Sequence, residues 1–509
     1  MIKKVLIANR GEIAVRIART CREMGITTAA VYSDVDRNAL HVQVCDEAIA
    51  IGGETAAESY LVQEKILKAA KETGADAIHP GYGFLSENPV FAEKVKASGF
   101  IWIGPPAQAI RVMGSKTEAR RLMKAAKVPV VPGSEGVLRN SKKAVAFAKE
   151  AGLPILLKAS AGGGGKGMRV VREMDQVAPA YDAAKREATA AFGDGSIYAE
   201  KFIEEPRHIE VQIMADLHGN VIHLGERECS LQRRHQKLVE ESPSPSVSPE
   251  TRQRLGETAV MAAKACGYEN AGTIEYLMDK NGEFYFLEMN TRLQVEHPVT
   301  EEVTGMDLVR MQLRVASGEP LSISQNEIQQ RGHAIEVRIY AEDVRGGFLP
   351  STGKLDRLRP PIGPGIREDA GLTEGMEVSR FYDPMISKLI VHAENRDAAI
   401  QRMIRALAEY QVSGLRTTIP ICHYIVSSKE FATGEFHTGI VEALYAERSQ
   451  QLLAKPLLDE EMIAAAIARA LHGAMPQAVN GTNGHQTLKT SIWKRDGRER
   501  SHRHLPRRS

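Results

Sequence analysis

The sequence predicts a protein of mixed α/β and α+β class that is built from several domains. Three observations support this prediction. Strand and helix patterns alternate over residues 1–106, a glycine-rich loop separates two strand patterns near residue 164, and an Asn-Gly pair joins two alternating segments within 272–290. A chain of 509 residues is too long for one compact core, and its length favours about three domains.

The amino-terminal segment has the pattern of a strand–helix–strand unit. Apolar residues 4–8 predict a strand, residues 12–24 predict a helix with one apolar face, and a second strand ends at Asp34. An acidic residue at that place is typical of dinucleotide-binding folds. The first turn, however, contains a single glycine, Gly11, where the dinucleotide motif needs three. We therefore do not predict NAD binding.

The middle of the chain alternates between helical and extended patterns. The expected elements are helices at 107–127, 141–151 and 249–267, strands at 153–160 and 168–173, further strands within 196–216, and a polar, proline-rich connection at 228–249.

The stretch "SAGGGGKGMR" indicates a phosphate-binding loop. A Walker A motif needs glycine at position 160 and Ser or Thr at position 167, where this chain has Ser160 and Gly167. The dinucleotide spacing is formally present at 162–167, but that motif opens a helix and this loop leads into a strand pattern. A glycine loop between two antiparallel strands is instead a flap that offers backbone N–H groups to phosphates, with Lys158 beside it as a cation. The alternative is an ordinary flexible loop.

Two glutamates are predicted to oppose each other in a hairpin. The pair Asn281-Gly282 is a strong signal for a two-residue turn. Counting outward from that turn places Glu275 opposite Glu288, with Cβ atoms about 5 Å apart. Opposed carboxylates repel each other unless a cation lies between them. The pair therefore predicts a metal site; the alternative is two solvated glutamates on an exposed face.

The segment after this hairpin carries polar side chains at alternate positions: Glu288, Asn290, Arg292, Gln294 and Glu296. If the segment stays extended, all five lie on one face. Oxygen ligands, a guanidinium and a further carboxylate on one face favour a site with a metal, an anion and a base. The alternative is a chance arrangement on a solvated edge.

Composition excludes several classes of partner. Lys+Arg number 66 against 64 Asp+Glu, so the net charge of +2 gives no reason to expect nucleic acid or an anionic membrane. The five cysteines are scattered without metal spacing, as in a cytoplasmic protein with reduced thiols. The apolar run near the amino terminus is too short for a signal peptide, and no run is long enough for a membrane span.

These motifs together resemble those of the biotin carboxylases, which are ATP-grasp enzymes of acetyl-CoA carboxylase and related carboxylases. The similar stretches are "ANRGEIAVRI", "HPGYGFLSEN", "GSK" at 114–116, "KASAGGGGKGMR", "EKFIEEPRHIEVQI", "ECSLQRRHQKLVEE", "EMNTRLQVEHPVTE", "AIEVRIYAED" and "FYDPMISKLI", and they lie within residues 1–445. The implied domains are an amino-terminal Rossmann-like domain at 1–113, an ATP-grasp domain at 114–325 with a mobile glycine-rich lid at about 130–203, a carboxy-terminal α+β domain at 330–445, and an extension at 446–509.

The resemblance implies a reaction and its participants. ATP phosphorylates bicarbonate to carboxyphosphate, and the carboxyl group passes to biotin on a carrier protein. The implied cofactors are two Mg²⁺ or Mn²⁺ ions. The implied partners are a biotin carboxyl carrier protein, carboxyltransferase chains and a second copy of this chain, in the cytoplasm and in pathways such as fatty acid biosynthesis.

The resemblance also implies roles for individual residues. Those around ATP are Lys116, Lys158, Gly162, Gly163, Gly164, Gly165, Lys166, Gly167, Glu200, Lys201, Ile203, His208, Gln232, His235, Leu277, Glu275 and Glu288. The metal ligands are Glu275, Glu288 and Asn290. Glu296 is the base that deprotonates bicarbonate, Arg338 stabilises the biotin enolate, and both act catalytically together with Arg292 and Lys237. The residues that place bicarbonate or biotin are Lys237, Arg292, Gln294, Val295, Arg338, Tyr82 and Gly83.

Some features depart from the pattern or favour alternatives. A biotin acceptor normally reads Ala/Val-Met-Lys-Met, and the nearest pair here, Met123-Lys124, lies in a helical pattern, so biotin is expected on another chain. The acyl acceptor (acetyl-CoA, propionyl-CoA or pyruvate) cannot be predicted. Residues past 450 fit a flexible extension or a docking segment. The competing functions are another ATP-grasp ligase, such as half of a carbamoyl-phosphate synthetase, and a regulatory protein that binds ATP without catalysis.

Overall fold

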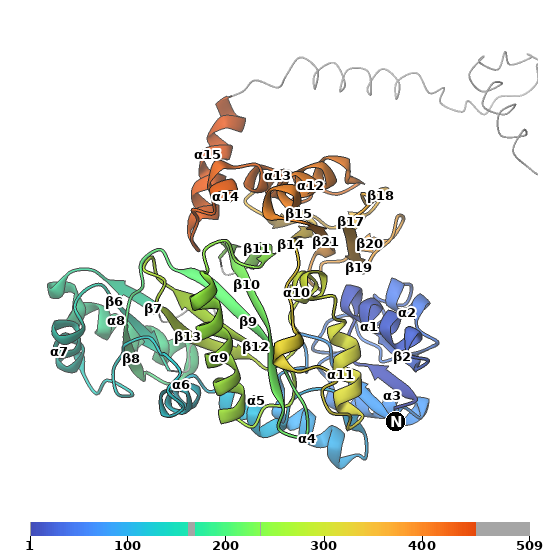
Figure 1. Cartoon of the computed structure of the whole chain (residues 1–509), viewed down its shortest axis with the longest axis horizontal. Helices are drawn as coiled ribbons and strands as arrows, with labels where there is room; N and C mark the ends of the chain where they lie inside the picture. Colours follow the sequence, from blue (N-terminus) through green and yellow to red (C-terminus); the bar gives the residue numbers. More distant parts are fainter. Residues whose placement is uncertain (1, 161–167, 235, 455–509) are drawn as a thin grey trace, which may run out of the picture. The chain divides into compact units, whose positions relative to one another are not determined.

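The computed structural model describes residues 2–160, 168–234 and 236–454, and side chains as far as residue 447. The chain divides into two units, Met1–Glu447 and Arg448–Ser509, and the features described below lie in the first, apart from the end of the helix at Ile440–Ala454. The mixed α/β and α+β class is confirmed (Figure 1). Within the described residues, every helix is too short or too polar to cross a membrane.

A parallel five-stranded sheet with strand order β3-β2-β1-β4-β5 forms the amino-terminal domain. The predicted strand–helix–strand unit is confirmed as β1, α1 and β2. The bounds are β1 Lys4–Ile7, α1 Gly11–Glu23, β2 Thr27–Tyr32, α2 Leu40–Val44, β3 Glu47–Ala50, α3 Gln63–Thr73, β4 Ala77–His79, α4 Pro89–Ala97 and β5 Ile101–Trp102.

The helix predicted at 107–127 is in fact two helices, α5 (Ala107–Gly114) and α6 (Lys116–Ala125). The break falls at Ser115, whose backbone is extended and whose hydroxyl accepts a hydrogen bond from the Glu118 amide at 3.4 Å. A serine favours this capping role over a helix interior because its side chain competes for backbone groups. The break makes Lys116 the first residue of α6.

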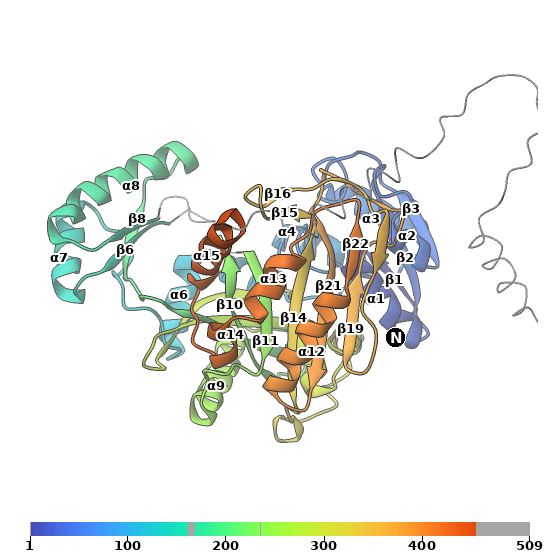
Figure 2. The ribbon, with the colours of Figure 1, turned by 90° about the horizontal axis from the view of Figure 1, so that it is seen from above.

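A small three-stranded sheet with order β7-β6-β8 forms a separate lobe with two helices. The bounds are α7 Ser141–Ala151, β6 Ile155–Ala159, β7 Met168–Val171, α8 Val177–Phe192 and β8 Ile197–Lys201. Figure 2 shows α7 and α8 beside β6 and β8. Strands β6 and β7 are antiparallel, with Lys158 paired to Met168, so the predicted strands on either side of the glycine loop are confirmed. The loop itself, 161–167, lies outside the described residues.

An eight-stranded sheet with order β13-β12-β9-β10-β11-β14-β21-β19 joins the middle of the chain to its carboxy-terminal part. Its strands are β9 Arg207–Ala215, β10 Val221–Arg233, β11 Gln236–Ser242, β12 Asn270–Met278, β13 Phe284–Asn290, β14 His333–Tyr340, β19 Ile366–Ala370 and β21 Met385–Ala393. Helices packed with this sheet are α9 Pro249–Ala265, α10 His297–Thr304 and α11 Leu308–Ala316. The prediction of a connection at 228–249 is wrong, because this stretch holds the end of β10 and all of β11. Three of its glutamates, Glu228, Glu240 and Glu241, are buried and hydrogen-bonded rather than solvated, which a sequence pattern does not reveal.

The predicted opposition of Glu275 and Glu288 is confirmed by the register of β12 and β13. The turn is not the expected two-residue turn, because the Asp279 amide donates to the Glu283 carbonyl at 2.8 Å and three residues lie between them. This shifts the pairing near the turn by one residue. A bulge after Glu275 shifts it back, and the two glutamates meet as predicted.

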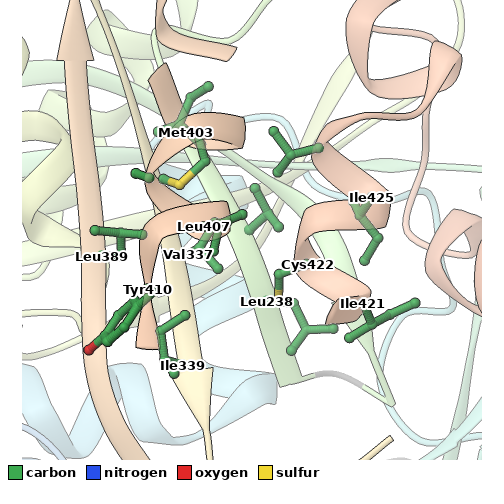
Figure 3. Close-up of a cluster of buried hydrophobic side chains, with 14 of the residues drawn as sticks. Leu238, Val337, Ile339, Leu389, Met403, Leu407, Tyr410, Ile421, Cys422 and Ile425 are labelled. Atoms are coloured by element: carbon green, nitrogen blue, oxygen red, sulfur yellow. The ribbon is translucent and has the colours of Figure 1, made fainter. Parts of the chain in front are cut away.

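Apolar side chains from β11, β14 and β21 pack with the carboxy-terminal helices to form the core shown in Figure 3. The cluster includes Leu238, Val337, Ile339, Leu389, Met403, Leu407, Tyr410, Ile421, Cys422 and Ile425. The helices are α12 Arg396–Glu409, α13 Ile419–Val426, α14 Lys429–Thr433 and α15 Ile440–Ala454. Short paired strands border this core: β15 Glu342–Asp343, β16 Leu349–Pro350, β17 Gly353–Lys354, β18 Arg357–Arg359, β20 Glu377–Val378 and β22 Gln411–Ser413.

Leu389→Ala is expected to lower the free energy of unfolding by about 2–5 kcal/mol, because Leu389 is fully buried in this cluster and its loss leaves a cavity. Chemical denaturation followed by circular dichroism measures the change. The matched control is Ile362→Ala, at a side chain that is 82% exposed, where a change within about 0.5 kcal/mol is expected. Equal effects of the two substitutions would contradict the assignment of Leu389 to the core.

Candidate active site

A cavity of about 1060 Å³ lies against the eight-stranded sheet, bordered also by β6 and β8 of the small lobe. We call it the central cavity. It brings together most of the residues that the sequence predicted for the site. Those that line it are Lys116, Lys158, Glu200, Lys201, Ile203, His208, Gln232, Lys237, Glu275, Leu277, Glu288, Asn290, Arg292, Gln294, Val295, Glu296 and Arg338.

The remaining predicted residues fall into two groups. Gly162, Gly163, Gly164, Gly165, Lys166, Gly167 and His235 lie outside the described residues. Tyr82 and Gly83 are described but border neither the central cavity nor the adjoining one of about 950 Å³. Tyr82 packs against the amino-terminal core, and its carbonyl accepts a hydrogen bond from Asn9 at 2.8 Å. Their approach to biotin stays a prediction.

The polar residues after β13 do not reach the cavity along an extended strand. Strand β13 ends at Asn290, and irregular backbone leads from there to α10 at His297. The assumption of a continuous strand to Glu296 is therefore wrong. All five polar side chains nevertheless line the central cavity, two from β13 and three from the bend and turn that follow it.

The two opposed glutamates have different surroundings. Glu275 is buried and accepts hydrogen bonds from Asn290 at 2.6 Å and from Gln294 at 2.8 Å. Burial raises the pKa of Glu275, but the charges of Lys237 and His208 outweigh it and hold that pKa well below its usual range. The Glu288 side chain faces the open cavity. Partial loss of hydration at the cavity wall and the charge of Glu275 both raise its pKa.

This pair fits a divalent cation. Carboxylate and amide oxygens are the hard ligands that Mg²⁺ and Mn²⁺ prefer, and Glu275, Glu288 and Asn290 supply both kinds at the cavity wall. A cation between the two carboxylates also removes the repulsion that raises the pKa of Glu288. The arrangement therefore agrees with the predicted metal ligands.

Cations hold Glu296 at the first turn of α10. The Lys237 ammonium donates to one carboxylate oxygen, and the Arg338 guanidinium donates to the other at 3.0 Å. Burial raises the pKa of Glu296, but the charges of Lys237, Arg338 and Arg227 outweigh it and hold the pKa well below its usual range. Glu296 is therefore ionised at neutral pH. Lys237 and Arg338 beside it are positive charges that can attract an anion.

Cationic side chains near the small lobe also form ion pairs. Lys158 on β6 lies 2.5 Å from a Glu200 oxygen, and Arg120 on α6 binds the other oxygen at 2.7 Å. Lys116 begins α6 at the edge of both cavities. Two lysines at one end of the cavity, beside the strands that carry the glycine loop, provide positive charge suited to a chain of phosphates.

Sequence patterns missed three buried residues that organise the site: Glu210, Arg227 and Glu240. Arg227 is fully buried and donates to Glu210 at 2.6 Å and to Gln294 at 2.6 Å. Glu210 also accepts from Lys237 at 2.6 Å, and Glu240 binds Arg338 at 2.5 Å. Glu210 alternates with apolar residues on β9, whereas Arg227 and Glu240 have charged neighbours on β10 and β11. Neither pattern distinguishes a buried ionic face from a solvated one.

Glu240 titrates near neutrality. Burial is the main cause and exceeds the opposing effect of Arg338, so the pKa of Glu240 rises to about 7. The folded protein therefore binds more protons than the unfolded chain between about pH 4.5 and pH 7, and the contribution of Glu240 to stability falls as the pH rises through that window.

The comparisons with known proteins agree with this geometry. Family models match three successive segments: "Biotin carboxylase, N-terminal domain" at residues 1–110, "Carbamoyl-phosphate synthase L chain, ATP binding domain" at 115–324, and "Biotin carboxylase C-terminal domain" at 336–443.

Curated relatives match at high identity. A biotin carboxylase of Halalkalibacterium halodurans is 54% identical over 441 residues, which are 87% of this chain and 97% of the relative. A pyruvate carboxylase subunit of Methanothermobacter thermautotrophicus is 52% identical over 442 residues, which are 87% of this chain and 90% of the relative.

A solved structure matches as well. It is the biotin carboxylase domain dimer of the 2-oxoglutarate carboxylase of Hydrogenobacter thermophilus, in complex with MgADP, ADP and bicarbonate. It is 49% identical with a TM-score of 0.82, and the match covers 87% of this chain and 99% of that one.

Glu240→Gln is expected to gain thermal stability relative to the parent chain as the pH rises from about 5 to about 7, because glutamine mimics the protonated carboxyl that the fold favours. Melting temperatures of both proteins across this range measure the effect. Glu257→Gln, on the exposed face of α9, is the control for a surface glutamate. A melting-temperature difference that stays constant or shrinks with rising pH would contradict the assignment.

Proposed function

The chain belongs to the biotin carboxylase family, and we propose how its residues perform the reaction of that family. The enzyme uses ATP and bicarbonate to carboxylate biotin through carboxyphosphate. The observation that carries this function is the arrangement of Glu296 between Lys237 and Arg338, in the same cavity as the opposed carboxylates of Glu275 and Glu288. One part of the cavity suits a metal-bound nucleotide, and the other suits a small anion beside a base.

We assign nucleotide binding to the end of the cavity near the small lobe. Lys116 and Lys158 bind the phosphate groups, and Lys158 shares its contact with Glu200 when they arrive. Glu275, Glu288 and Asn290 hold Mg²⁺ or Mn²⁺, which acts as a Lewis acid on the phosphate oxygens when bound. The other described residues predicted around ATP, including His208, line the same cavity.

We assign bicarbonate to the part of the cavity beside Glu296. Arg292, Gln294 and Val295 border this part and hold the anion. Glu296 takes the proton of the bicarbonate hydroxyl, and the resulting carbonate oxygen attacks the γ-phosphorus of ATP as ADP leaves. The neighbouring cations neutralise the charge that builds up as the two anions are joined.

The low pKa of Glu296 makes it a weak base until substrate arrives. Arg338 and Lys237 hold its two oxygens in this structure. An anion that binds beside Arg338 and Lys237 also accepts hydrogen bonds from these two cations. They then stabilise the ionised carboxylate of Glu296 less, and the pKa of Glu296 rises. Substrate binding thus activates the base. After carboxyphosphate forms, its bond between the carboxyl carbon and the phosphate oxygen breaks, and the released phosphate takes the N–H proton of biotin. Arg338 stabilises the resulting negative charge on the biotin ring while the deprotonated nitrogen bonds to the carboxyl carbon.

We propose that biotin arrives on a separate carrier protein. Met123-Lys124 lies on α6 with Met123 fully buried, so this lysine does not sit in an exposed acceptor motif. The relative from Methanothermobacter thermautotrophicus, named as one subunit of its pyruvate carboxylase, supports a division of the whole reaction among chains. Carboxyltransferase chemistry then lies on a further chain, with acetyl-CoA, propionyl-CoA and pyruvate as candidate acceptors. The dimeric solved relative supports a homodimer.

The competing ATP-grasp ligase function has less support. The family model over the central segment is shared with carbamoyl-phosphate synthase, but the flanking segments match biotin carboxylase models. Arg338, which contacts Glu296, comes from the carboxy-terminal one of these segments.

Glu296→Ala is expected to retain ATP binding, while the rate of bicarbonate-dependent ADP release falls at least about 100-fold. A general base contributes a rate acceleration of this order. A coupled assay of ADP release and calorimetric titration with an ATP analogue measure the two properties. Glu257→Ala on the exposed face of α9 serves as the control. Unchanged turnover in the Glu296 variant would eliminate the base assignment.

A further inference from the structure

Lys388 is a buried cation that borders neither large cavity but reaches the backbone of the site. It lies on β21 and is fully buried. Its ammonium donates a hydrogen bond to the carbonyl oxygen of Val295 at 2.6 Å. The next residue along the chain is Glu296, so Lys388 holds the peptide group that joins the proposed anion-binding residue to the proposed base.

The surroundings of Lys388 keep it charged. Its ammonium lies 3.4 Å from Glu12 on α1 and 4.0 Å from Asp369 on β19. Burial disfavours the charged form, but Glu12, Glu336 and Asp369 outweigh it and raise the pKa of Lys388 above its ordinary value. A buried ammonium without such partners is strongly destabilising, so these carboxylates allow an ionised donor to exist beneath the site.

The sheet register explains how two cations reach adjacent residues. Lys388 on β21 is the direct cross-strand partner of Arg338 on β14, and both side chains lie on the same face. Arg338 binds the side chain of Glu296, while Lys388 binds the carbonyl of Val295. Two neighbouring strands therefore hold two consecutive residues of the irregular segment before α10.

The other backbone hydrogen bonds of that segment, among the described residues, hold different peptide groups. The Thr291 amide donates to Glu87 at 2.9 Å, and the Gln294 carbonyl lies 2.7 Å from Nδ1 of His297. The Glu296 carbonyl accepts from the Val299 amide at 3.4 Å, which is a long bond at the start of a helix. The shorter, charge-assisted bond from Lys388 is better suited to fix the 295–296 peptide.

We propose that Lys388 is a positioning residue for bicarbonate: it fixes the Val295–Glu296 peptide so that the Val295 amide and the Glu296 carboxylate face the anion together. Glu12 and Asp369 hold Lys388 in place, which gives the amino-terminal "RGEIA" stretch a part in anion binding. The proposal rests on the assignment of bicarbonate to this part of the cavity. Lys388 touches neither substrate and accepts no proton in the reaction.

The test compares KM for bicarbonate with the affinity for ATP. Lys388→Met removes the charge and keeps an unbranched side chain. It is expected to raise KM for bicarbonate at least about 10-fold, because displacement by about 1 Å in a site costs up to about 100-fold. The dissociation constant of an ATP analogue should change less than about 2-fold, because Lys388 lies outside the nucleotide end of the cavity.

Arg396→Met is the matched control. Arg396 is another mostly buried cation on the carboxy-terminal side, and it binds Glu241 and two carbonyls without lining the central cavity. This variant should leave KM for bicarbonate within about 2-fold of the parent. If it raises that KM as much as Lys388→Met does, the effect is general loosening and the proposal fails.

A milder variant decides the matter if Lys388→Met does not fold. Glu12→Gln preserves size. Burial raises the pKa of Glu12 to about 7, so above that pH the variant leaves Lys388 with one charge partner fewer, and KM for bicarbonate measured there should rise about 3-fold with ATP affinity unchanged. A loss of kcat or of ATP affinity with KM for bicarbonate unchanged would overturn the positioning role. Failure of the parent chain to release ADP in response to bicarbonate would instead overturn the proposed function, so the two failures are distinguishable.

Discussion

The site depends on a carboxylate that is buried among cations. Glu296 stays ionised out of water only because Lys237 and Arg338 bind its oxygens and Arg227 adds charge nearby. Each of these cations also binds a second carboxyl group: Glu210 binds Arg227 and Lys237, and Glu240 binds Arg338. Breaking a buried pair leaves an uncompensated charge that costs several kcal/mol, so these residues hold one another in place.

The eight-stranded sheet makes this ionic network possible. Its strands place Glu210, Arg227, Lys237, Glu240 and Arg338 side by side although they are far apart in sequence. The same sheet carries the carboxylates proposed to bind the metal on β12 and β13, and β21 brings Lys388 to the carbonyl of Val295 beside the proposed anion site. Strands β6 and β8 of the small lobe border the same cavity at the end proposed for the nucleotide, so under the proposed function the sheet and the lobe together align the phosphate donor with the anion that receives the phosphoryl group.

Local chemistry in the sequence predicted much of the site, and burial accounts for most of what it could not predict. The glutamate pair was found because an Asn-Gly turn fixes register to within a residue, although a longer turn and a bulge offset each other in the actual hairpin. The polar residues from Glu288 to Glu296 were predicted by type and spacing to share a site, and they line one cavity, but the extended path assigned to those after Asn290 was wrong. Arg227 and Lys388 were not predicted, because the partners that make them important come from distant strands.

Transfer of label from ¹⁴C-bicarbonate to free biotin by the purified chain tests the central claim most directly. The account predicts acid-labile label in biotin only when ATP and Mg²⁺ are both present, with ADP released in proportion to the label. ADP release without label in biotin, at equal rates with and without bicarbonate, would contradict it and leave only a nucleotide site with a different acceptor.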